Sequence, residues 1–567
     1  MLASKDSGIA GHNAEMPRSP RLNAWLLLAL ATCLSCPGPT EAADAAGAAR
    51  TSPTRPRIGL VLSGGGARGL AHVGVLKVLE AERIPIDAIA GTSMGAIVGG
   101  LYASGMSAAE LEAELSKVQW DTVFSQRVDR QHLSQRRKEE DFEISPLIEL
   151  GIRDGELRTP VGAVSSRGLE TLLRRYTLPV RAVRDFDALP IRFRAVATDL
   201  ESGAAVVLDH GDLALALRSS MSVPGVFPPT EVEGRILGDG GLVNNVPVDV
   251  ARAMGVDLVI VVNIGTPLAG RETLGSALGI TAQMINILTE QNVQRSLASL
   301  GPRDVLVLPQ LGALGAGDFV KVVEAIELGQ RGARAALPRL RAHAISAEAY
   351  AQWRAEHPKL RRTEAQVNFV AFEGSTLTNP SRFAAQLESQ PGAAFNAQRA
   401  ESDARTLAAS GDYLRADYRL ESTPDRGDGL IFDLDDKPWG PNYLRLGIDL
   451  ATDFNGRGSF NLKLSHNRHW LTANGTEWRN RLQIGEKLSF FTELYHPLNW
   501  TIGLSNDWFV AGYAATERSD RTLYGEDGAQ LARYKRTGSR AGIDLGQTWG
   551  RFGEFRVGIG TQLLRAT

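Results

Sequence analysis

Cysteine is nearly absent from this 567-residue chain, and its two cysteines, Cys33 and Cys36, both lie within residues 1–50. If that segment is removed, the remaining chain has no thiol, which excludes a disulfide framework and a cysteine metal site. An excess of positive charge is also missing: the formal net charge is −2, so a nucleic acid is not expected as a partner. After residue 50 the sequence contains no apolar run long enough to predict a membrane-spanning helix.

Residues 1–50 have the pattern of an export signal. Arg18 and Arg21 precede the apolar run "AWLLLALATCLS", and the small residues "PTEAADAAGAA" follow it. The run is short for a bilayer span, so we predict a signal peptide over residues 1–45. Met16 is an alternative start, because the segment after it is already a complete signal. Lipidation of a cysteine is the alternative to cleavage, but the flanking residues match a lipidation motif poorly.

Short apolar runs alternate with helical patterns from Arg57 to about Leu340. The runs are "IGLVLS", "IDAIAGTS", "IRFRAVATDL", "RILGDGG", "LVIVVNI" and "DVLVLPQ". Helices are predicted between them at Ala71–Glu82, Gly95–Ala103, Ala108–Leu115 and Arg167–Tyr176. This alternation predicts an α/β domain over residues 55–345, with a mostly parallel sheet flanked by helices. A charged linker is predicted at 346–365.

Residues 366–438 follow another pattern. "VNFVAFEG" is predicted as a strand, "SRFAAQLES" and "NAQRAESDARTLAASGDY" as helices, and "YLRADYRLES" and "GLIFDLDD" as two further strands. This order of elements, together with the "SGDY" turn before the second strand, resembles a POTRA module. A small α+β module is therefore expected here.

The apolar period becomes two after Trp439. In "YLRLGIDLAT", Leu446, Ile448 and Leu450 share one face of a predicted strand. Segments of about ten residues with this alternation are typical of a transmembrane β-barrel, which we predict over 440–567. A soluble β-sandwich is the alternative, and the export signal and the preceding module favour the barrel. The stretch has room for about eight strands and ends in "LLRAT", which predicts an incomplete barrel.

A glycine-rich turn follows the first apolar run, in "LVLSGGGARGLAHVGVL", residues 60–76. Gly64, Gly66 and Gly69 fit G-x-G-x-x-G, the dinucleotide fingerprint. A strand–glycine–helix turn offers free backbone N–H groups to any anion. The turn alone therefore does not distinguish a pyrophosphate from another negative group.

The second glycine turn resolves this ambiguity. Residues 91–95, "GTSMG", fit G-x-S-x-G, a nucleophile elbow that points the Ser93 hydroxyl outward at a helix N-terminus. A dinucleotide domain needs an acidic residue at the end of its second strand, whereas Asp87 lies at the beginning of this one. The two turns together favour acyl transfer, in which one supplies the nucleophile and the other supplies N–H donors to the oxyanion.

A nucleophilic serine needs a base. "GRILGDGGLVNNVPVDVA" places Asp239 on a tight turn at the end of a strand, which makes it the leading candidate. His72 and His210 are the alternative bases, because the sequence does not exclude either as a neighbour of Ser93 in space. No metal and no organic cofactor is expected.

These three motifs, in this order, resemble those of the patatin-like phospholipases, and the resemblance covers roughly residues 57–340. The run "SSMSVPGVFPP", residues 219–229, resembles the family's apolar segment ahead of the aspartate. The resemblance implies a Ser93–Asp239 catalytic dyad that hydrolyses lipid acyl esters. It implies an oxyanion hole formed by Gly64, Gly65, Gly66 and Arg68, with Arg68 acting as a nearby charge or as a loop brace. The supporting glycines of the motifs are Gly69, Gly91, Gly95, Gly240 and Gly241.

The whole chain resembles the patatin-like autotransporters of type Vd secretion, in which the POTRA module and barrel export and anchor the lipase. The resemblance implies an exported phospholipase A or esterase with a membrane phospholipid substrate. It places the protein at the outer membrane, with the enzyme domain either periplasmic or at the cell surface. The barrel-assembly machinery is the expected partner during biogenesis, and a homodimer is left open. The alternative function is an outer-membrane polypeptide transport or assembly protein with an inactive patatin domain.

Overall fold

The computed structural model describes residues 55–124, 130–144, 149–159, 167–265, 268, 270–360, 366–423, 425–452, 458–498, 507–526, 530–549 and 552–567. The predicted signal peptide lies outside these residues. No helix among the described residues is both long and apolar enough to cross a bilayer.

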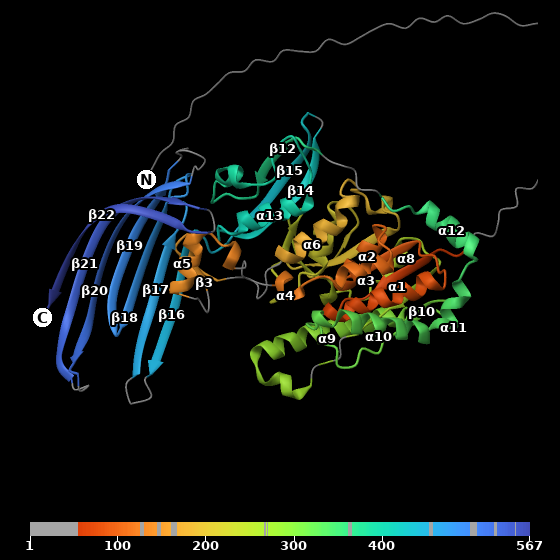
Figure 1. The fold of residues 1–567 in the computed structure, drawn as a ribbon. Coiled ribbons are helices and arrows are strands. Elements are labelled where there is room, and N and C mark those ends of the chain that lie inside the picture. Colours follow the sequence, from red (N-terminus) through yellow and green to blue (C-terminus); the bar gives the residue numbers. More distant parts are fainter. Residues whose placement is uncertain are drawn as a thin grey trace, which may run out of the picture. The chain divides into compact units, whose positions relative to one another are not determined.

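The first domain is built on an eight-stranded, mostly parallel sheet (Figure 1). Its order is β10-β9-β1-β2-β5-β8-β7, and β6 also pairs with β5. The strands are β1 (Ile58–Leu62), β2 (Ala88–Thr92), β5 (Arg192–Asp199), β6 (Ala205–Leu208), β7 (Thr230–Val232), β8 (Arg235–Asp239), β9 (Leu258–Val262) and β10 (Val305–Val307). The five strands from β10 to β5 run parallel. β6 and β8 each pair antiparallel with β5, and β7 pairs antiparallel with β8. The predicted mostly parallel α/β sheet is confirmed.

Helices cover both faces of this sheet. They are α1 (Ala71–Ala81), α2 (Met94–Ala103), α3 (Ala108–Leu115), α4 (Trp120–Val123), α6 (Arg167–Thr177), α7 (Leu213–Ser220), α8 (Val248–Ala253), α9 (Ala277–Ala298), α10 (Val322–Ala335), α11 (Leu337–Leu340) and α12 (Ala347–Glu356). The four predicted helices correspond to α1, α2, α3 and α6 within one residue at each end. Helix α12 falls within the predicted linker: Ser346 caps its N-terminus and Trp353 is buried in the domain core.

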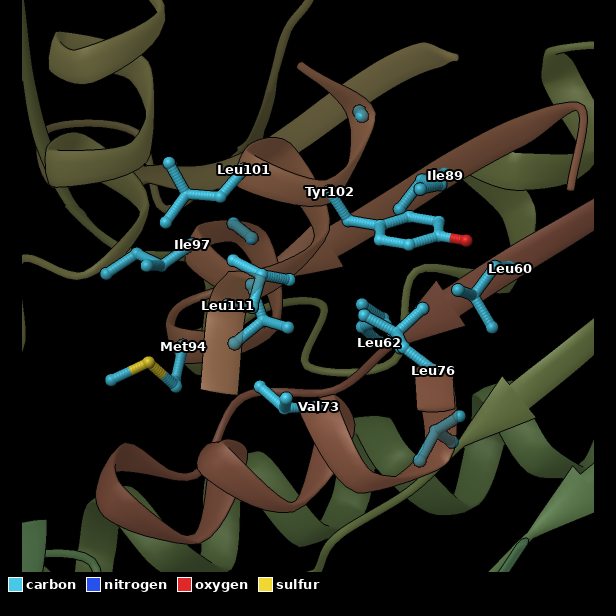
Figure 2. Packing of buried hydrophobic residues seen from close by; sticks show 14 of the residues in the cluster. Leu60, Leu62, Val73, Leu76, Ile89, Met94, Ile97, Leu101, Tyr102 and Leu111 are labelled. Atoms are coloured by element: carbon cyan, nitrogen blue, oxygen red, sulfur yellow. The ribbon is translucent and has the colours of Figure 1, made fainter. Parts of the chain in front are cut away.

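Alternate residues of the central strand pack on opposite faces of the sheet. Leu60 and Leu62 of β1 belong to one buried cluster, and Val61 between them belongs to another. Figure 2 shows the first cluster, in which Leu62 lies near Leu76 of α1 and residues of α2 surround Leu111 of α3. A parallel strand covered on both faces needs a continuous apolar run rather than alternation, and "IGLVL" has one.

The module after the first domain has a three-stranded sheet in the order β12-β15-β14. Its elements are β11 (Gln366–Val367), β12 (Phe369–Glu373), a 3-10 helix (Pro380–Gln386), β13 (Ala393–Ala394), α13 (Ala397–Ala408), β14 (Tyr413–Thr423) and β15 (Gly427–Asp436). The order of the longer elements agrees with the expectation, with two differences. The first helix is a 3-10 helix, and the two-residue strands β11 and β13, which pair with each other, were not predicted separately. The assignment of this module as POTRA stays a prediction.

The last part of the chain forms a large antiparallel sheet, drawn in blue in Figure 1. Its consecutive strands are β16 (Asn442–Thr452), β17 (Gly458–Arg468), β18 (Glu477–Gly485), β19 (Lys487–Pro497), β20 (Trp508–Tyr524), β21 (Gln530–Thr548) and β22 (Glu554–Ala566). Each strand pairs with the next one along the chain, as hairpins do. The predicted antiparallel sheet is therefore present.

This sheet exposes its apolar side chains and buries polar ones. On β16, Ile448 is 59% exposed, and on β22, Ile559 is 83% exposed. In contrast, Asn467, Arg479 and Glu493 are buried, each at no more than 3% exposure. A soluble β-sandwich has the reverse arrangement, with apolar residues between its sheets. The alternation therefore matches a sheet whose apolar face meets an apolar environment.

Two strands of the first domain's sequence extend this sheet, which the sequence analysis did not predict. β3 (Glu149–Arg153) pairs with β16, and β4 (Glu156–Arg158) pairs with β3. Asp154 and Gly155 form the turn between them, with φ of 55° and 82°. Asp-Gly is a strong signal for a two-residue hairpin, because both turn positions need positive φ. Helix α5 (Gln135–Glu143) lies in the same insertion.

Candidate active site

The three predicted motifs lie at the ends of strands of one sheet. The glycine loop follows β1, Ser93 follows β2, and Asp239 ends β8. Leu62 of β1 pairs with Gly91, and Asp239 pairs with Ala197 of β5, which is the next strand after β2. Because β1 and β2 run parallel, their carboxyl ends meet at one edge, which is where α/β sheets bind ligands.

Ser93 occupies a strained turn between β2 and α2. Its φ is 54° and its ψ is −124°, a conformation that L-residues rarely adopt. The surrounding glycines make the turn sterically feasible: a Cβ on Gly95 would lie 2.3 Å from the carbonyl oxygen of Leu62. The Ser93 amide donates to Ser220 Oγ at 2.9 Å, and Ser220 Oγ donates to the Val196 carbonyl at 2.5 Å. This is the geometry of a nucleophile elbow.

Asp239 is buried beside this serine. One of its carboxylate oxygens accepts a hydrogen bond from the backbone, and the other does not. Its Oδ1 accepts from the Gly241 amide at 2.7 Å. Its Oδ2 is buried and makes no hydrogen bond of full geometry within the described residues. Burial raises the pKa of Asp239 to about 6, while the Ser93 hydroxyl, the Gly241 amide and the charge of Arg218 each lower it. Oδ2 is therefore available to the Ser93 proton, on a carboxylate that is more basic than usual.

The glycine loop offers two backbone N–H groups near the elbow. The Gly64 amide is used within the protein, since Asn245 accepts from it through its carbonyl oxygen at 3.3 Å and its Oδ1 at 3.2 Å. Within the described residues, the amides of Gly65 and Gly66 find no acceptor. Gly66 has φ of +58°, and a Cβ there would lie 2.4 Å from the Ala316 carbonyl oxygen. Gly65 and Gly66 are thus the free donors of this loop.

The remaining predicted residues are Arg68 and the supporting glycines, and their contacts are with the protein backbone and neighbouring side chains. The guanidinium of Arg68 donates to the carbonyl of Leu314 at 2.5 Å and to that of Ile264 at 2.9 Å. Of the two roles that the sequence left open for Arg68, these contacts are those of a loop brace. A Cβ would come under 3.0 Å from another atom at each supporting glycine: Gly69, Gly91, Gly95, Gly240 and Gly241.

Neither alternative histidine is placed to act on Ser93. His72 Nε2 bonds to the Ser63 carbonyl at 2.8 Å, and its Nδ1 is buried without a partner among the described residues. Burial lowers the pKa of His72 to about 4, so its ring is neutral. His210 is exposed and lies between Asp209 and Glu233 at hydrogen-bond distances of 2.6 and 2.9 Å. Asp239 is therefore the base candidate that this structure brings to the serine.

Sequence reasoning missed the residues that hold these motifs from a distance. Ser220 holds the elbow amide, and Asn245 holds the first glycine of the loop. Asn292 of α9 donates to the Gly241 carbonyl at 2.9 Å and accepts from the Asn245 amide at 2.8 Å. Asn244 and Asn245 stand in "GLVNNVPV", just after the aspartate motif, but that run alone does not predict which loop they reach.

One group of side chains has the composition of a metal site. Within the described residues, Glu140, His469 and Glu477 bring their ligand atoms within 4.8 Å of one another. The guanidinium of Arg137 bonds to all three of them. An arginine therefore already supplies the positive charge of this cluster, which contains neither of the proposed catalytic residues.

The site combines, in one α/β domain, a serine on a strained strand–helix turn, a buried aspartate and a glycine-rich loop with free amides. Residues 60–252 match the sequence profile of the patatin-like phospholipase family. The chain therefore contains a patatin-like phospholipase domain.

Two curated relatives are similar in sequence. An uncharacterized NTE family protein of Mycobacterium tuberculosis is 33% identical over 232 residues, which cover 41% of this chain and 55% of the relative. The human patatin-like phospholipase domain-containing protein 6 is 31% identical over 211 residues, 37% of this chain and 13% of the relative. The chain thus spans about half the length of the mycobacterial relative and a small part of the human one.

Among solved structures, BamA from Haemophilus ducreyi lacking POTRA domains 1–3 is 16% identical. The match covers 36% of each chain at a TM-score of 0.28. A likeness at this TM-score supports no assignment.

Proposed function

We propose that this protein hydrolyses fatty-acyl esters of phospholipids through Ser93 and Asp239, and that it is exported and held at the outer membrane by the sheet β16–β22. One observation carries the chemical proposal: a buried aspartate with a raised pKa keeps one oxygen unused beside a strained serine. Perturbed carboxyl groups of this kind concentrate at catalytic sites.

The first step uses both residues of the dyad. Asp239 Oδ2 accepts the proton of the Ser93 hydroxyl as Ser93 Oγ attacks the ester carbonyl carbon. The carbonyl oxygen becomes negatively charged and accepts hydrogen bonds from the amides of Gly65 and Gly66. One such donor contributes on the order of 3 kcal/mol to lowering the barrier. The tetrahedral intermediate collapses to an acyl-serine and releases the lysolipid alcohol, which takes the proton back from Asp239.

The second step restores the enzyme. Asp239 removes a proton from a water molecule, whose oxygen attacks the acyl-serine carbonyl in the same oxyanion hole. Collapse releases the fatty acid and returns the proton to Ser93. The scheme needs only groups of this chain, the substrate and water.

An exposed apolar helix face beside the base supports a lipid substrate. Thr289 and Asn292 in the second half of α9 donate to the Gly241 carbonyl, next to Asp239. The same helix exposes four apolar side chains on one face: Ile280, Met284, Ile287 and Leu288, each at least 41% exposed. Apolar surface this close to a catalytic carboxylate suits an aggregated lipid better than a freely soluble ester.

The location at the outer membrane is supported by the exposed apolar face of β16–β22 and by the predicted export signal. The expected consequence is a chain that needs detergent to stay in solution. If the full chain remains monodisperse in buffer without detergent, the membrane part of the proposal is wrong, and the chemical part is unaffected.

The test of the chemistry uses the full chain in detergent micelles containing phospholipid, with released fatty acid as the readout. Ser93→Ala and Asp239→Asn should each lower the rate by roughly two to four orders of magnitude. The double variant should be hardly worse than either, because the two residues act as a unit. Ser104→Ala and Asp199→Asn are the matched controls, since the Ser104 hydroxyl donates to the Leu101 carbonyl of α2 and the Asp199 carboxylate accepts from amides of its own turn.

Two results would decide against the proposal. If Asp239→Asn retains activity, another base is at work. If the intact chain releases no fatty acid and Ser93 does not react with a fluorophosphonate probe, the alternative of an assembly protein with an inactive enzyme domain is favoured.

A further inference from the structure

A buried arginine lies behind the proposed base. Arg218, on α7, has a side chain that is 1% exposed. Its Nη1 donates to Ser222 Oγ at 2.7 Å, and its Nη2 donates to the Pro228 carbonyl at 2.9 Å. Its Nε donates to Glu170 Oε1 at 3.2 Å. A charge at this depth is costly to bury unless its partners are good, so its presence beside the site calls for a reason.

The arginine reaches the base through the segment that follows α7. The Asp239 amide donates to the Ser222 carbonyl at 2.8 Å, and the hydroxyl of the same Ser222 accepts from Arg218. The guanidinium also lies 5.2 Å from the ring centre of Phe227. Arg218 therefore fixes both ends of the 222–228 segment, and that segment fixes the backbone of Asp239.

The arginine also acts on the base through its charge. The positive charge of Arg218 lowers the pKa of Asp239 against the larger opposing effect of burial. Three further charged groups form a chain of ion pairs that begins at Arg218. Glu170 partly neutralises Arg218, and Arg415 of β14 lies 3.6 Å from Glu170 Oε2. Asp435 of β15 in turn pairs with Arg415 at 2.7 Å.

We propose that Arg218 is a positioning residue that holds Asp239 in place and keeps it ionised, so that it can accept the Ser93 proton near neutral pH. This inference rests on the proposed function, because it takes Asp239 to be the base. Glu170 then has the opposite effect: by neutralising Arg218 it keeps the Asp239 carboxylate basic. Neutralising Arg218 and neutralising Glu170 should therefore shift the pH at which Asp239 ionises in opposite directions.

The experiment measures kcat/KM of the full chain in detergent–phospholipid micelles from pH 4.5 to 9. In Arg218→Gln the midpoint of the acid limb should rise, because the charge that lowers the pKa of Asp239 is removed. The rate at pH 6 should fall several-fold more than the rate at pH 8.5. In Arg218→Lys, which keeps the charge but loses the forked donor geometry, the midpoint should stay close to that of the parent while kcat falls. In Glu170→Gln the midpoint should move to lower pH.

A merely structural role predicts something else. It would lower the rate by the same factor at every pH and would leave the midpoint unchanged. The matched control is Arg194→Gln, which removes an arginine that pairs with Asp187 and has no contact with Asp239; its profile should be that of the parent. If Arg218→Gln does not fold, Glu170→Gln carries the test alone.

An unchanged or raised midpoint in Glu170→Gln, or an unchanged midpoint in a folded Arg218→Gln, would overturn the inference. Failure of the proposed function looks different. In that case the parent chain itself releases no fatty acid, or Asp239→Asn remains active, whatever the Arg218 variants do.

Discussion

Acid should inactivate this protein well above the pH at which an ordinary aspartate becomes protonated. Asp239 has a pKa of about 6, compared with 3.8 for the unperturbed side chain. A general base works only when it is deprotonated, so the rate should rise with pH through this value and then level off. Between pH 7 and pH 5 the ionised fraction falls about tenfold for a pKa of 6, whereas it would hardly change for a pKa of 3.8. The loss of rate over this interval should therefore be about tenfold.

The assay is the rate of Ser93 labelling by a fluorophosphonate, measured on the full chain from pH 4.5 to 9. Labelling needs the same proton transfer as ester attack but no later step, so the profile reports the base directly. A profile that is flat from pH 5 to 8 would refute the assignment of a raised pKa to the base. The residual labelling of Asp239→Asn should not show this limb; if it does, another group titrates there.

Three further substitutions test other parts of the site and the fold. Gly66→Ala should lower kcat by roughly a hundredfold, because its Cβ would meet the Ala316 carbonyl at 2.4 Å and displace the donor loop; Gly203→Ala, also at positive φ but with open space around it, is the control. Ser220→Ala should lower the labelling rate of Ser93 about tenfold, since a buried amide left without its acceptor costs about 1–3 kcal/mol; a parent-like rate would show that the elbow holds itself. Ile559→Lys should destabilise the membrane-inserted sheet by up to about 2–4 kcal/mol, visible as loss of the folded band in unheated gel electrophoresis, whereas Val207→Lys on the enzyme domain should leave that band intact.

The three glycine-containing motifs could be located from sequence because local backbone geometry dictates their composition. A strand that must turn sharply into a helix needs glycine where a Cβ would strike backbone, as at Gly95. The residue between such glycines lies on the turn itself, in neither the strand nor the helix, which makes Ser93 the candidate nucleophile. The residues that hold the motifs are different. Ser220 is 127 positions from Ser93, and Asn245 is 181 positions from Gly64, so only the folded chain brings them together.

The hairpin of β3 and β4 was missed although its turn signal is plain. Asp154-Gly155 predicts a two-residue hairpin, but the sequence around it lies inside a domain whose other strands are continuous apolar runs. "ELGIR" and "ELR" are polar by comparison. β3 pairs with β16, and β4 pairs with β3, so neither joins the parallel sheet. The local sequence does not indicate that β16 is the partner strand.

The contacts of α5 with the polar face of the large sheet explain why this helix is rich in charged residues. This helix reads "QRRKEEDFE" and would be a solvated helix in an ordinary enzyme domain. Instead Arg136 is buried and pairs with Glu477 of β18 at 2.9 Å and with Glu493 of β19 at 3.0 Å. A sheet that exposes its apolar side chains must satisfy its polar ones on the other face, and buried charges are tolerated there only when they are paired. The enzyme domain's insertion supplies the matching charges, which explains why a run of arginines and glutamates is buried in this chain.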